Sequence, residues 1–312
     1  MSFLCWMIIV TIKLRIIIHL SVFIWKKLIA PSIGLGLDVA TQGRWAVVTG
    51  ATDGIGKAFA EALAAKGLDI VLVSRSLEKL ENVSTEIKAA YGVSTKIVEA
   101  DLTEGQQVYD KIAKAIDKLE IGVLVNNAGV GYNLLETFNN VSEELIANLL
   151  QVNIAATTFI TKIILPGMVK RKKGVVINIS STSAAIPSPY LSVYAASKAF
   201  VDKLSADLAA EAAPHGVTVQ CVLPGPVATK MIKKKQGTWM APTPKIFVNA
   251  CLKTVGIESR TTGYLPHYLI VGIFDSLNYI CEKIAVWFAS KIAINIRNRT
   301  LLKIKQKHSK LN

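Results

Sequence analysis

The stretch Thr49-Gly50-Ala51-Thr52-Asp53-Gly54-Ile55-Gly56 decides the fold of this chain of 312 residues. It follows a short apolar run at 45–49 and leads into an Ala-rich amphipathic run at 55–66. Three glycines permit a tight turn, let backbone N–H groups approach a pyrophosphate, and allow a helix to pack close to the strand. The spacing T-G-x-x-x-G-x-G between a strand and a helix therefore predicts a dinucleotide site that uses Thr49, Gly50, Thr52, Asp53, Gly54, Ile55 and Gly56.

Outward from this turn, strand and helix signals alternate as far as residue 222. The predicted strands are 45–49, 70–74, 95–100, 122–125, 174–179 and 218–222, and the predicted helices are 55–66, 77–91, 106–119, 142–169 and 190–213. Each strand is a continuous apolar run, which is typical of a parallel sheet that helices cover on both faces. We therefore predict an α/β fold with a doubly wound parallel sheet of the Rossmann type, formed by a single domain over 45–229.

The second predicted strand ends in Ser74-Arg75-Ser76. Enzymes that use NAD place an acidic residue here, where it binds the ribose 2′-hydroxyl. A guanidinium with neighbouring hydroxyls instead suits a 2′-phosphate, and no carboxylate precedes Glu78 to repel it. Ser74 and Arg75 therefore favour NADP(H) as the cofactor; the alternative is a solvated arginine at a strand end.

Tyr194 and Lys198 occupy positions i and i+4 of a predicted helix and so share one face of it. A nearby ammonium favours the phenolate, which would lower the pKa of Tyr194 from its usual value of about 10. Tyr194 could then give a proton to a carbonyl oxygen in reduction, or act as a base in the reverse direction. Ser181 stands at the end of the predicted strand 174–179, where its hydroxyl could bind the same oxygen.

Taken in order, the motifs from Trp45 to Thr229 resemble those of one family, the short-chain dehydrogenases/reductases. Besides the glycine-rich turn, they are Asp101, Asn126-Asn127-Ala128-Gly129, Asn153, Ser181, Tyr194, Lys198 and Pro224-Gly225-Pro226-Val227-Ala228-Thr229. The resemblance implies a catalytic tetrad of Asn153, Ser181, Tyr194 and Lys198, with Asn153 helping to hold a proton-relay water. It also implies that the cofactor is bound by Asp101 at the adenine, by Asn127 as support, by Tyr194 and Lys198 at the nicotinamide ribose, and by Val227 and Thr229.

A narrower resemblance is to the branch that contains 17-beta-hydroxysteroid dehydrogenases types 3 and 12 and the very-long-chain 3-oxoacyl-CoA reductases. It rests on residues 45–57, on Val73-Ser74-Arg75-Ser76, on residues 119–127 and on Thr254-Val255-Gly256. The chain departs from the type 12 pattern at Ala128, where N-N-V-G is usual. The branch implies NADPH and the endoplasmic reticulum membrane, and the family implies a homodimer through helices 142–169 and 190–213. Lys26 and Lys27, which follow the apolar run at the amino end, favour a catalytic domain that faces the cytosol.

Charge and hydropathy are unevenly distributed along the chain. With 51% hydrophobic residues and a mean hydropathy of +0.41 the chain is not disordered. The net charge is +4 over residues 1–45, −2 over 46–229 and +12 over 230–312. The basic excess therefore flanks apolar ends instead of covering the central domain, which excludes nucleic acid as the expected partner and favours an anionic membrane.

The two ends of the chain are expected to contact that membrane. Residues 1–30 are a predicted anchor, although Lys13, Arg15 and His19 interrupt the apolar run and leave its depth open. Residues 31–44 are a predicted linker, and 230–263 a substrate lid whose Lys233, Lys234 and Lys235 could meet either acyl-CoA phosphates or the membrane. Residues 264–312 are an apolar and then basic region that we expect at the membrane.

These features predict an NADPH-dependent reductase that acts on the ketone of a hydrophobic substrate, most readily a long-chain 3-oxoacyl-CoA. Two alternatives stay open, a dehydrogenase of keto-steroids and a lipid-binding scaffold without turnover. A lumenal enzyme is a third, since Asn82 and Asn140 lie in glycosylation sequons. No metal site is expected, and the four cysteines are predicted to be reduced, buried thiols.

Overall fold

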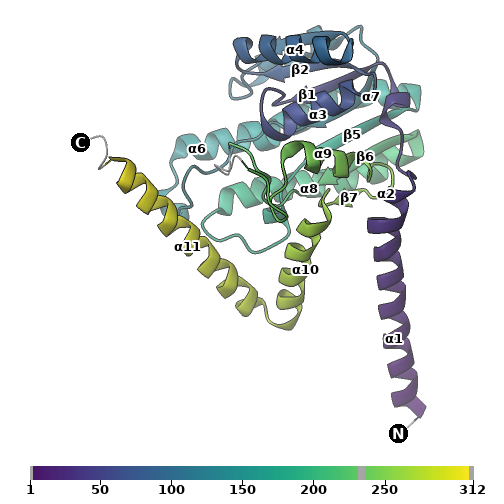
Figure 1. Cartoon of the computed structure of the whole chain (residues 1–312), viewed down its shortest axis with the longest axis vertical. Helices are drawn as coiled ribbons and strands as arrows, with labels where there is room; N and C mark the ends of the chain where they lie inside the picture. The colour runs from purple at the N-terminus through teal and green to yellow at the C-terminus, as the bar shows by residue number, and fades with distance from the viewer. Residues whose placement is uncertain (1–2, 231–235, 309–312) are drawn as a thin grey trace.

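The computed structural model describes residues 3–230 and 236–308; Lys233, Lys234 and Lys235 lie outside the described residues. Its body is a parallel sheet in the order β3-β2-β1-β4-β5-β6-β7 (Figure 1). The strands are β1 Trp45–Thr49, β2 Asp69–Ser74, β3 Thr95–Glu99, β4 Ile121–Asn126, β5 Gly174–Ile179, β6 Val217–Val222 and β7 Arg260–Thr261. The order reverses between β1 and β4, and ligands of such sheets bind beside the carboxyl ends of the strands at this point. The predicted fold class is confirmed.

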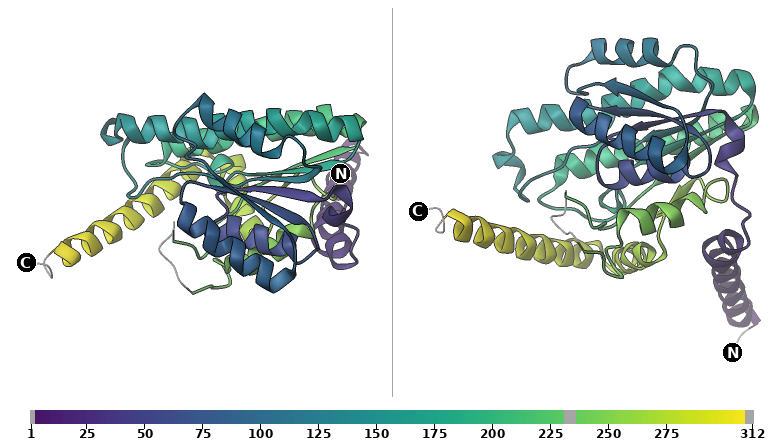
Figure 2. Two further views of the ribbon diagram at one scale, coloured as in Figure 1. Left: turned by 90° about the horizontal axis from the view of Figure 1, so that it is seen from above. Right: turned by 45° about the horizontal axis from the view of Figure 1, so that its top comes forward.

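Helices cover both faces of the sheet, as the view from above shows (Figure 2). One face carries α3 Gly54–Ala64, α4 Leu77–Tyr91 and α9 Pro244–Leu252, and the other carries α5 Gln106–Ile116, α7 Ala156–Arg171 and α8 Ser192–Ala212. Within β1, Ala46 and Val48 belong to the first core and Val47 to the second. Alternate residues of a strand point to opposite faces, so the unbroken apolar runs reflect burial on both sides.

Two features of the body were not predicted. The helix expected at 142–169 consists of α6 Glu143–Asn148, a π-helical segment Leu149–Ala155 and α7. The strand β7 is too short to leave a periodic signal, and it extends the sheet beside β6. Together with α9, whose Phe247 and Cys251 are fully buried, β7 places much of the region 230–263 in the body.

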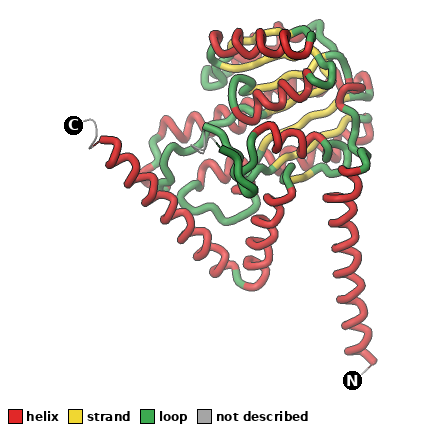
Figure 3. Tube along the Cα trace, viewed as in Figure 1, coloured by secondary structure: helices red, strands yellow, loops and turns green. Residues whose placement is uncertain are grey.

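Two helices leave the body on the same side of it, and a third runs back from the far end of the second (Figures 1 and 3). They are α1 Phe3–Ile24, α10 Leu265–Ile280 and α11 Glu282–His308. By length and composition, two helical stretches of the described chain could cross a membrane. They are Cys5–Ser32 and Glu143–Arg171, the latter formed by α6, the π-helical segment and α7. At the junction of α10 and α11, Tyr279 and Ile280 are 94% and 75% exposed. Contiguous exposed apolar surface is typical of sites that contact a membrane or a partner.

The segments next to these helices are tied to the body. The expected linker 31–44 contains a 3-10 helix, Val39–Gln42, and Val39 is buried in the core. Near the other end of the chain, Arg297 of α11 forms an ion pair with Glu136 of the body at 2.9 Å. Among the cysteines, Cys221 and Cys251 are buried as expected, whereas Cys281 is half-buried and Cys5 is exposed. The expectation of four buried thiols is therefore wrong for Cys5, and Cys281 meets it only in part.

Candidate active site

The glycine-rich turn between β1 and α3 forms a cradle of backbone. Gly50 and Gly54 have φ angles of +64° and +54°, which favour glycine. A Cβ on Gly56 would lie 2.2 Å from the carbonyl oxygen of Gly50, so the first turn of α3 is pressed against the loop. The amino end of α3 thus faces the switch point with exposed backbone in place of side chains, and this cradle fits a pyrophosphate.

Asn127 fastens the carboxyl end of β4 to this turn. Its Nδ2 donates hydrogen bonds to the carbonyl oxygens of Thr49 and Gly50 at 3.0 and 3.3 Å. In return, the Thr49 hydroxyl accepts the backbone N–H groups of Asn127 and Ala128, both at 3.0 Å. The residues expected to support the cofactor site therefore bind the protein's own backbone, which fixes the spacing between β1 and β4.

The residues expected at the adenine half lie along the edge formed by β1, β2 and β3. The hydroxyls of Thr52 and Ser74 are 3.0 Å apart, which joins the glycine-rich turn to the end of β2. Arg75 is exposed beside them, and among the described residues no carboxylate forms an ion pair with it. The Asp101 carboxylate accepts the backbone N–H and the hydroxyl of Thr103 at 3.0 and 2.8 Å.

Asn153 lies fully buried in the π-helical segment, and its side chain braces two other elements. Its Oδ1 accepts the backbone N–H of Val130 at 2.9 Å, and its Nδ2 donates to the Val130 carbonyl at 3.1 Å and to the Ser197 hydroxyl at 2.9 Å. Single turns of π-helix inside α-helices are frequent at functional sites. The wider turn here directs the amide between the loop after β4 and α8.

Tyr194 and Lys198 lie on α8 close to the ends of β4 and β5. The Lys198 Nζ donates to the carbonyl oxygen of Ile179 at 3.0 Å, and it is 6.0 Å from the centroid of the Tyr194 ring. A Cβ on Gly129 would lie 3.2 Å from this Nζ and 3.3 Å from Asn153 Oδ1. Gly129 therefore permits the close approach of Lys198 and Asn153.

Burial shifts the pKa values of both Lys198 and Tyr194. It lowers the pKa of Lys198 to about 8, because the ammonium loses its hydration. It also raises the pKa of Tyr194, although a hydrogen bond with Ser181 acts in the opposite direction. The expected lowering of the Tyr194 pKa by Lys198 is therefore not found; desolvation outweighs an ammonium that lies 6.0 Å from the ring.

The loop 224–229 connects the catalytic cluster to the glycine-rich turn. Its first residue, Pro224, accepts the N–H of Thr182, next to Ser181, at 2.9 Å. At its other end, the Thr229 Cγ2 is 3.1 Å from the position of a Cβ on Gly54. Val227 is buried between these points. Asp53, expected to bind the cofactor, forms an ion pair with Lys230 at 2.7 Å.

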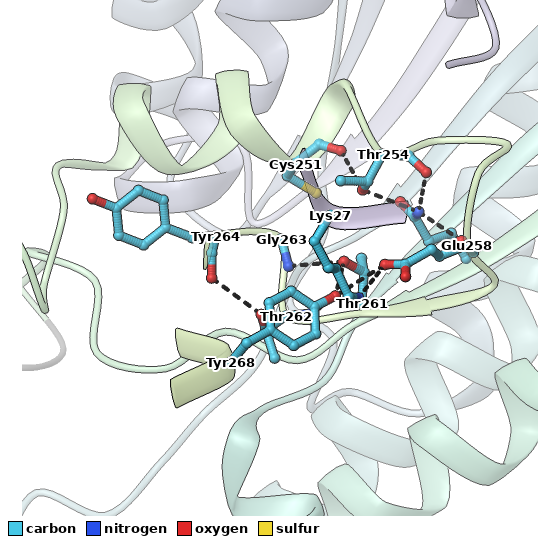
Figure 4. Close-up of polar contacts among 10 residues, drawn as sticks. Lys27, Cys251, Thr254, Glu258, Thr261, Thr262, Gly263, Tyr264 and Tyr268 are labelled. Atoms are coloured by element: carbon cyan, nitrogen blue, oxygen red, sulfur yellow. Dashed lines mark hydrogen bonds and ion pairs between the residues drawn. The ribbon is translucent and has the colours of Figure 1, made fainter. Parts of the chain in front are cut away.

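Sequence reasoning missed His267, which is fully buried on the first turn of α10 and touches this loop. A histidine inside the apolar run 264–288 was the one available signal. A second polar cluster lies beside it, at the end of the anchor (Figure 4). There Lys27 pairs with Glu258 and lies 3.5 Å from the centroid of the Tyr268 ring, so the anchor is docked on α10.

A parallel sheet with a glycine-rich turn at its switch point and a Ser-Tyr-Lys cluster beside it defines a dinucleotide-dependent oxidoreductase. The chain belongs to the short chain dehydrogenase family, whose pattern matches residues 44–239. One relative is very-long-chain 3-oxoacyl-CoA reductase of Anas platyrhynchos, which is 47% identical over 75% of this chain and 76% of the relative. Inactive hydroxysteroid dehydrogenase-like protein 1 of Homo sapiens is 42% identical over 88% of this chain and 82% of that protein.

Solved structures agree with this membership. A 7beta-hydroxysteroid dehydrogenase matches with a TM-score of 0.75 and 25% identity, over 81% of this chain and 100% of the other. A short-chain dehydrogenase from Sphingobium yanoikuyae in complex with NADPH matches with a TM-score of 0.65 and 27% identity, over 77% and 94% of the two chains. The body thus has the architecture of proteins in which a dinucleotide is bound.

Proposed function

We propose that this protein is an NADPH-dependent reductase that converts the ketone of a long-chain 3-oxoacyl-CoA to the alcohol in fatty-acid elongation. The observation that carries this proposal is the complete cluster Asn153, Ser181, Tyr194 and Lys198, gathered at the strand ends beside the nucleotide cradle. The 47% identity to a very-long-chain 3-oxoacyl-CoA reductase supports the substrate class. The cluster also argues against a scaffold without turnover.

The residues of the cluster divide the work of the reduction. Bound NADPH supplies a hydride to the ketone carbon. Tyr194 gives its phenolic proton to the oxygen, and Ser181, which is hydrogen-bonded to Tyr194, binds the same oxygen. Lys198 places a positive charge beside the phenol as negative charge develops there. Asn153 holds the loop after β4 against α8; the relay water expected beside it stays a prediction.

The substrate class is tested by following NADPH oxidation by the detergent-solubilised full chain with two substrates in parallel, a long-chain 3-oxoacyl-CoA and a 17-keto steroid. Turnover of the thioester alone supports the proposal. Turnover of the steroid alone would assign the protein to steroid metabolism, which the likeness to a 7beta-hydroxysteroid dehydrogenase makes the second candidate. Bound NADPH without turnover of either substrate would support the scaffold.

Arg75 should decide between the two nicotinamide cofactors. It is exposed at the end of β2, next to the hydroxyl pair Thr52 and Ser74. Hydrogen bonds to charged groups contribute about 1.5–3 kcal/mol, so we expect Arg75→Ala to raise the KM for NADPH at least about tenfold. The KM for NADH should change little. Lys79→Ala, an exposed cation one turn further along, is the control, and equal losses for both cofactors would contradict the assignment.

The rate should fall on the alkaline side as Lys198 loses its proton. Its pKa is about 8, whereas the pKa of Tyr194 is raised, so Tyr194 remains a proton donor throughout this range. We expect kcat/KM for the ketone to fall as pH rises through about 8. Lys198→Arg should shift this fall in kcat/KM to higher pH, since a guanidinium keeps its charge. If the alkaline fall in kcat/KM stays at the same pH in Lys198→Arg, a group other than Lys198 causes it.

The pKa of Lys198 also fixes the direction of a stability change. It is lowered in the folded protein from its usual 10.5, so the unfolded chain binds more protons between about 8 and 10.5. The contribution of this group to stability therefore increases with pH in that window.

We also propose that α1 anchors the protein in the endoplasmic reticulum membrane with its catalytic domain in the cytosol, and that α10 and α11 rest on the same surface. The exposed apolar side chains of α1 and of the α10–α11 junction, which lie on one side of the body, support this (Figure 1). Protease should then digest the domain in intact microsomes. Glycosylation of Asn82 or Asn140 would place the domain in the lumen instead. A homodimer through α7 and α8 stays a proposal, which sedimentation in detergent can test.

A further inference from the structure

Outside the catalytic cluster, one fully buried imidazole binds the loop 224–229 directly. His267 lies on the first turn of α10 and is 0% exposed. The backbone N–H of Gly225 donates to its Nδ1 at 3.1 Å, and its Nε2 lies 3.1 Å from the carbonyl oxygen of Pro226. Two successive residues of the loop are therefore held by the two nitrogens of one ring.

These contacts specify the state of the ring. Because Nδ1 accepts a hydrogen bond, the proton resides on Nε2, which donates to the Pro226 carbonyl. The ring is then neutral, and burial lowers the pKa of His267, which keeps it so. The fit is close, since a Cβ on Gly225 would lie 2.7 Å from His267 Cδ2. Only glycine at position 225 leaves room for the imidazole.

The loop held in this way borders the part of the site where reduction takes place. Thr182, whose N–H binds Pro224, follows Ser181 directly in the chain. The nicotinamide end of a dinucleotide must lie beside Ser181 and Tyr194, so that its hydride can reach the substrate ketone that these two residues bind. The residues expected at the adenine end, Ser74 and Arg75, lie at the end of β2. The hydrogen bonds of His267 to Gly225 and Pro226 therefore brace the loop at the nicotinamide half of the expected cofactor site.

The helical turn that carries His267 is also held by contacts outside the loop. The next residue, Tyr268, accepts the N–H of Thr262 at 3.0 Å and donates to Glu258 at 3.0 Å (Figure 4). Lys27 of the anchor pairs with the same carboxylate and covers the Tyr268 ring. The first turn of α10 is thus pinned between the body and the anchor, which fixes the position of the imidazole.

We propose that His267 is the positioning residue for the nicotinamide half of the cofactor site, acting through the backbone of Gly225 and Pro226. The proposal rests on the proposed cofactor but not on the substrate. Its test is therefore a binding measurement, with two ligands that differ in one half. NADPH reaches both halves of the site, whereas adenosine 2′,5′-bisphosphate reaches the adenine half alone.

The experiment titrates both ligands into the solubilised full chain, with wild type, His267→Phe and His267→Asn. The phenylalanine replaces the imidazole by an apolar aromatic ring and so removes both hydrogen bonds; the asparagine retains an acceptor for Gly225. We expect His267→Phe to raise the Kd of NADPH about tenfold and to leave the Kd of adenosine 2′,5′-bisphosphate within about twofold. His267→Asn should recover part of the loss. His215→Phe, at an exposed histidine, is the control and should change neither constant.

Gly225→Ala tests the same contact from the loop side and should reproduce the selective loss, even where a His267 variant does not fold. Equal weakening of both ligands in these variants would show a general folding defect and overturn the proposal, as would an unchanged Kd for NADPH. Wild-type protein that binds neither ligand would instead refute the proposed cofactor. If the variants weaken NADPH binding selectively but the protein turns over no ketone, this inference stands and the proposed reductase activity is refuted.

Discussion

Tyr194→Phe should abolish ketone reduction while the protein still folds and binds NADPH. The change removes one oxygen from a side chain whose pKa burial raises, so in the native protein it is a protonated donor. Positioned acid–base groups contribute about 10²–10⁴-fold in rate, and we expect kcat to fall within or beyond this range. The measurement is NADPH oxidation at saturating 3-oxoacyl-CoA, with the Kd of NADPH determined in parallel.

The matched control is Tyr91→Phe, which makes the same change at an exposed tyrosine at the end of α4. It should leave kcat unaltered. Retention of more than about a hundredth of the wild-type kcat in Tyr194→Phe would contradict the role of Tyr194, since general acid catalysis contributes at least about a hundredfold. The outcome would also distinguish this chain from a binding protein. The human relative named inactive is 42% identical to it, so overall identity alone does not decide the matter.

Gly56→Ala should eliminate NADPH binding at concentrations that saturate the wild type. The added Cβ would lie 2.2 Å from the Gly50 carbonyl oxygen and 2.4 Å from Asn127 Nδ2. Neither neighbour can move freely, because one is backbone and the other is bonded to Thr49. The first turn of α3 must therefore shift away from the turn, and the cradle for the pyrophosphate is lost. Overpacking of this kind costs about 1–3 kcal/mol, so we also expect a lower Tm.

Gly272→Ala is the control for that substitution. It adds the same methyl group to a helical glycine with nothing within 4 Å of the new atom. It should leave NADPH binding unchanged, and its effect on Tm should be small and of either sign. Binding of NADPH by Gly56→Ala with wild-type affinity would show that the cofactor does not lie against this turn.

Much of the body follows from local sequence. Most strands are largely β-branched and apolar runs because both faces of the sheet are covered there, whereas β3 at the sheet edge exposes Lys96 and Glu99. The predicted bounds of β1 to β6 lie within two residues of the observed ones. The glycines of the turn are equally local, since their φ angles and the approach of α3 require the absence of a side chain. The residues Ser181, Tyr194 and Lys198 could be named because their spacing on a strand end and a helix face brings them together.

What local sequence could not give depends on contacts between distant segments. The direction of the Tyr194 pKa shift required the depth of burial, which no i to i+4 spacing reveals. Within the π-helical turn, the amide of Asn153 binds Val130 and Ser197, which are 23 and 44 residues away along the chain. Likewise, the partners of His267 and of Lys27 are set by packing, because the first turn of α10 contacts both the loop 224–229 and the anchor.

The sequence by itself determined the parallel sheet and the glycine-rich turn, since each of these is encoded in residues close together along the chain. The catalytic roles of Asn153, Ser181, Tyr194 and Lys198 stay a prediction. The tertiary structure alone decided how those residues are held: Thr49 by Asn127, the loop 224–229 by His267, and the anchor by Glu258 and Tyr268. The physical reason is that burial, ionisation and hydrogen-bond partners are properties of the packed molecule. A periodic pattern records which face of an element is covered, but not which group covers it.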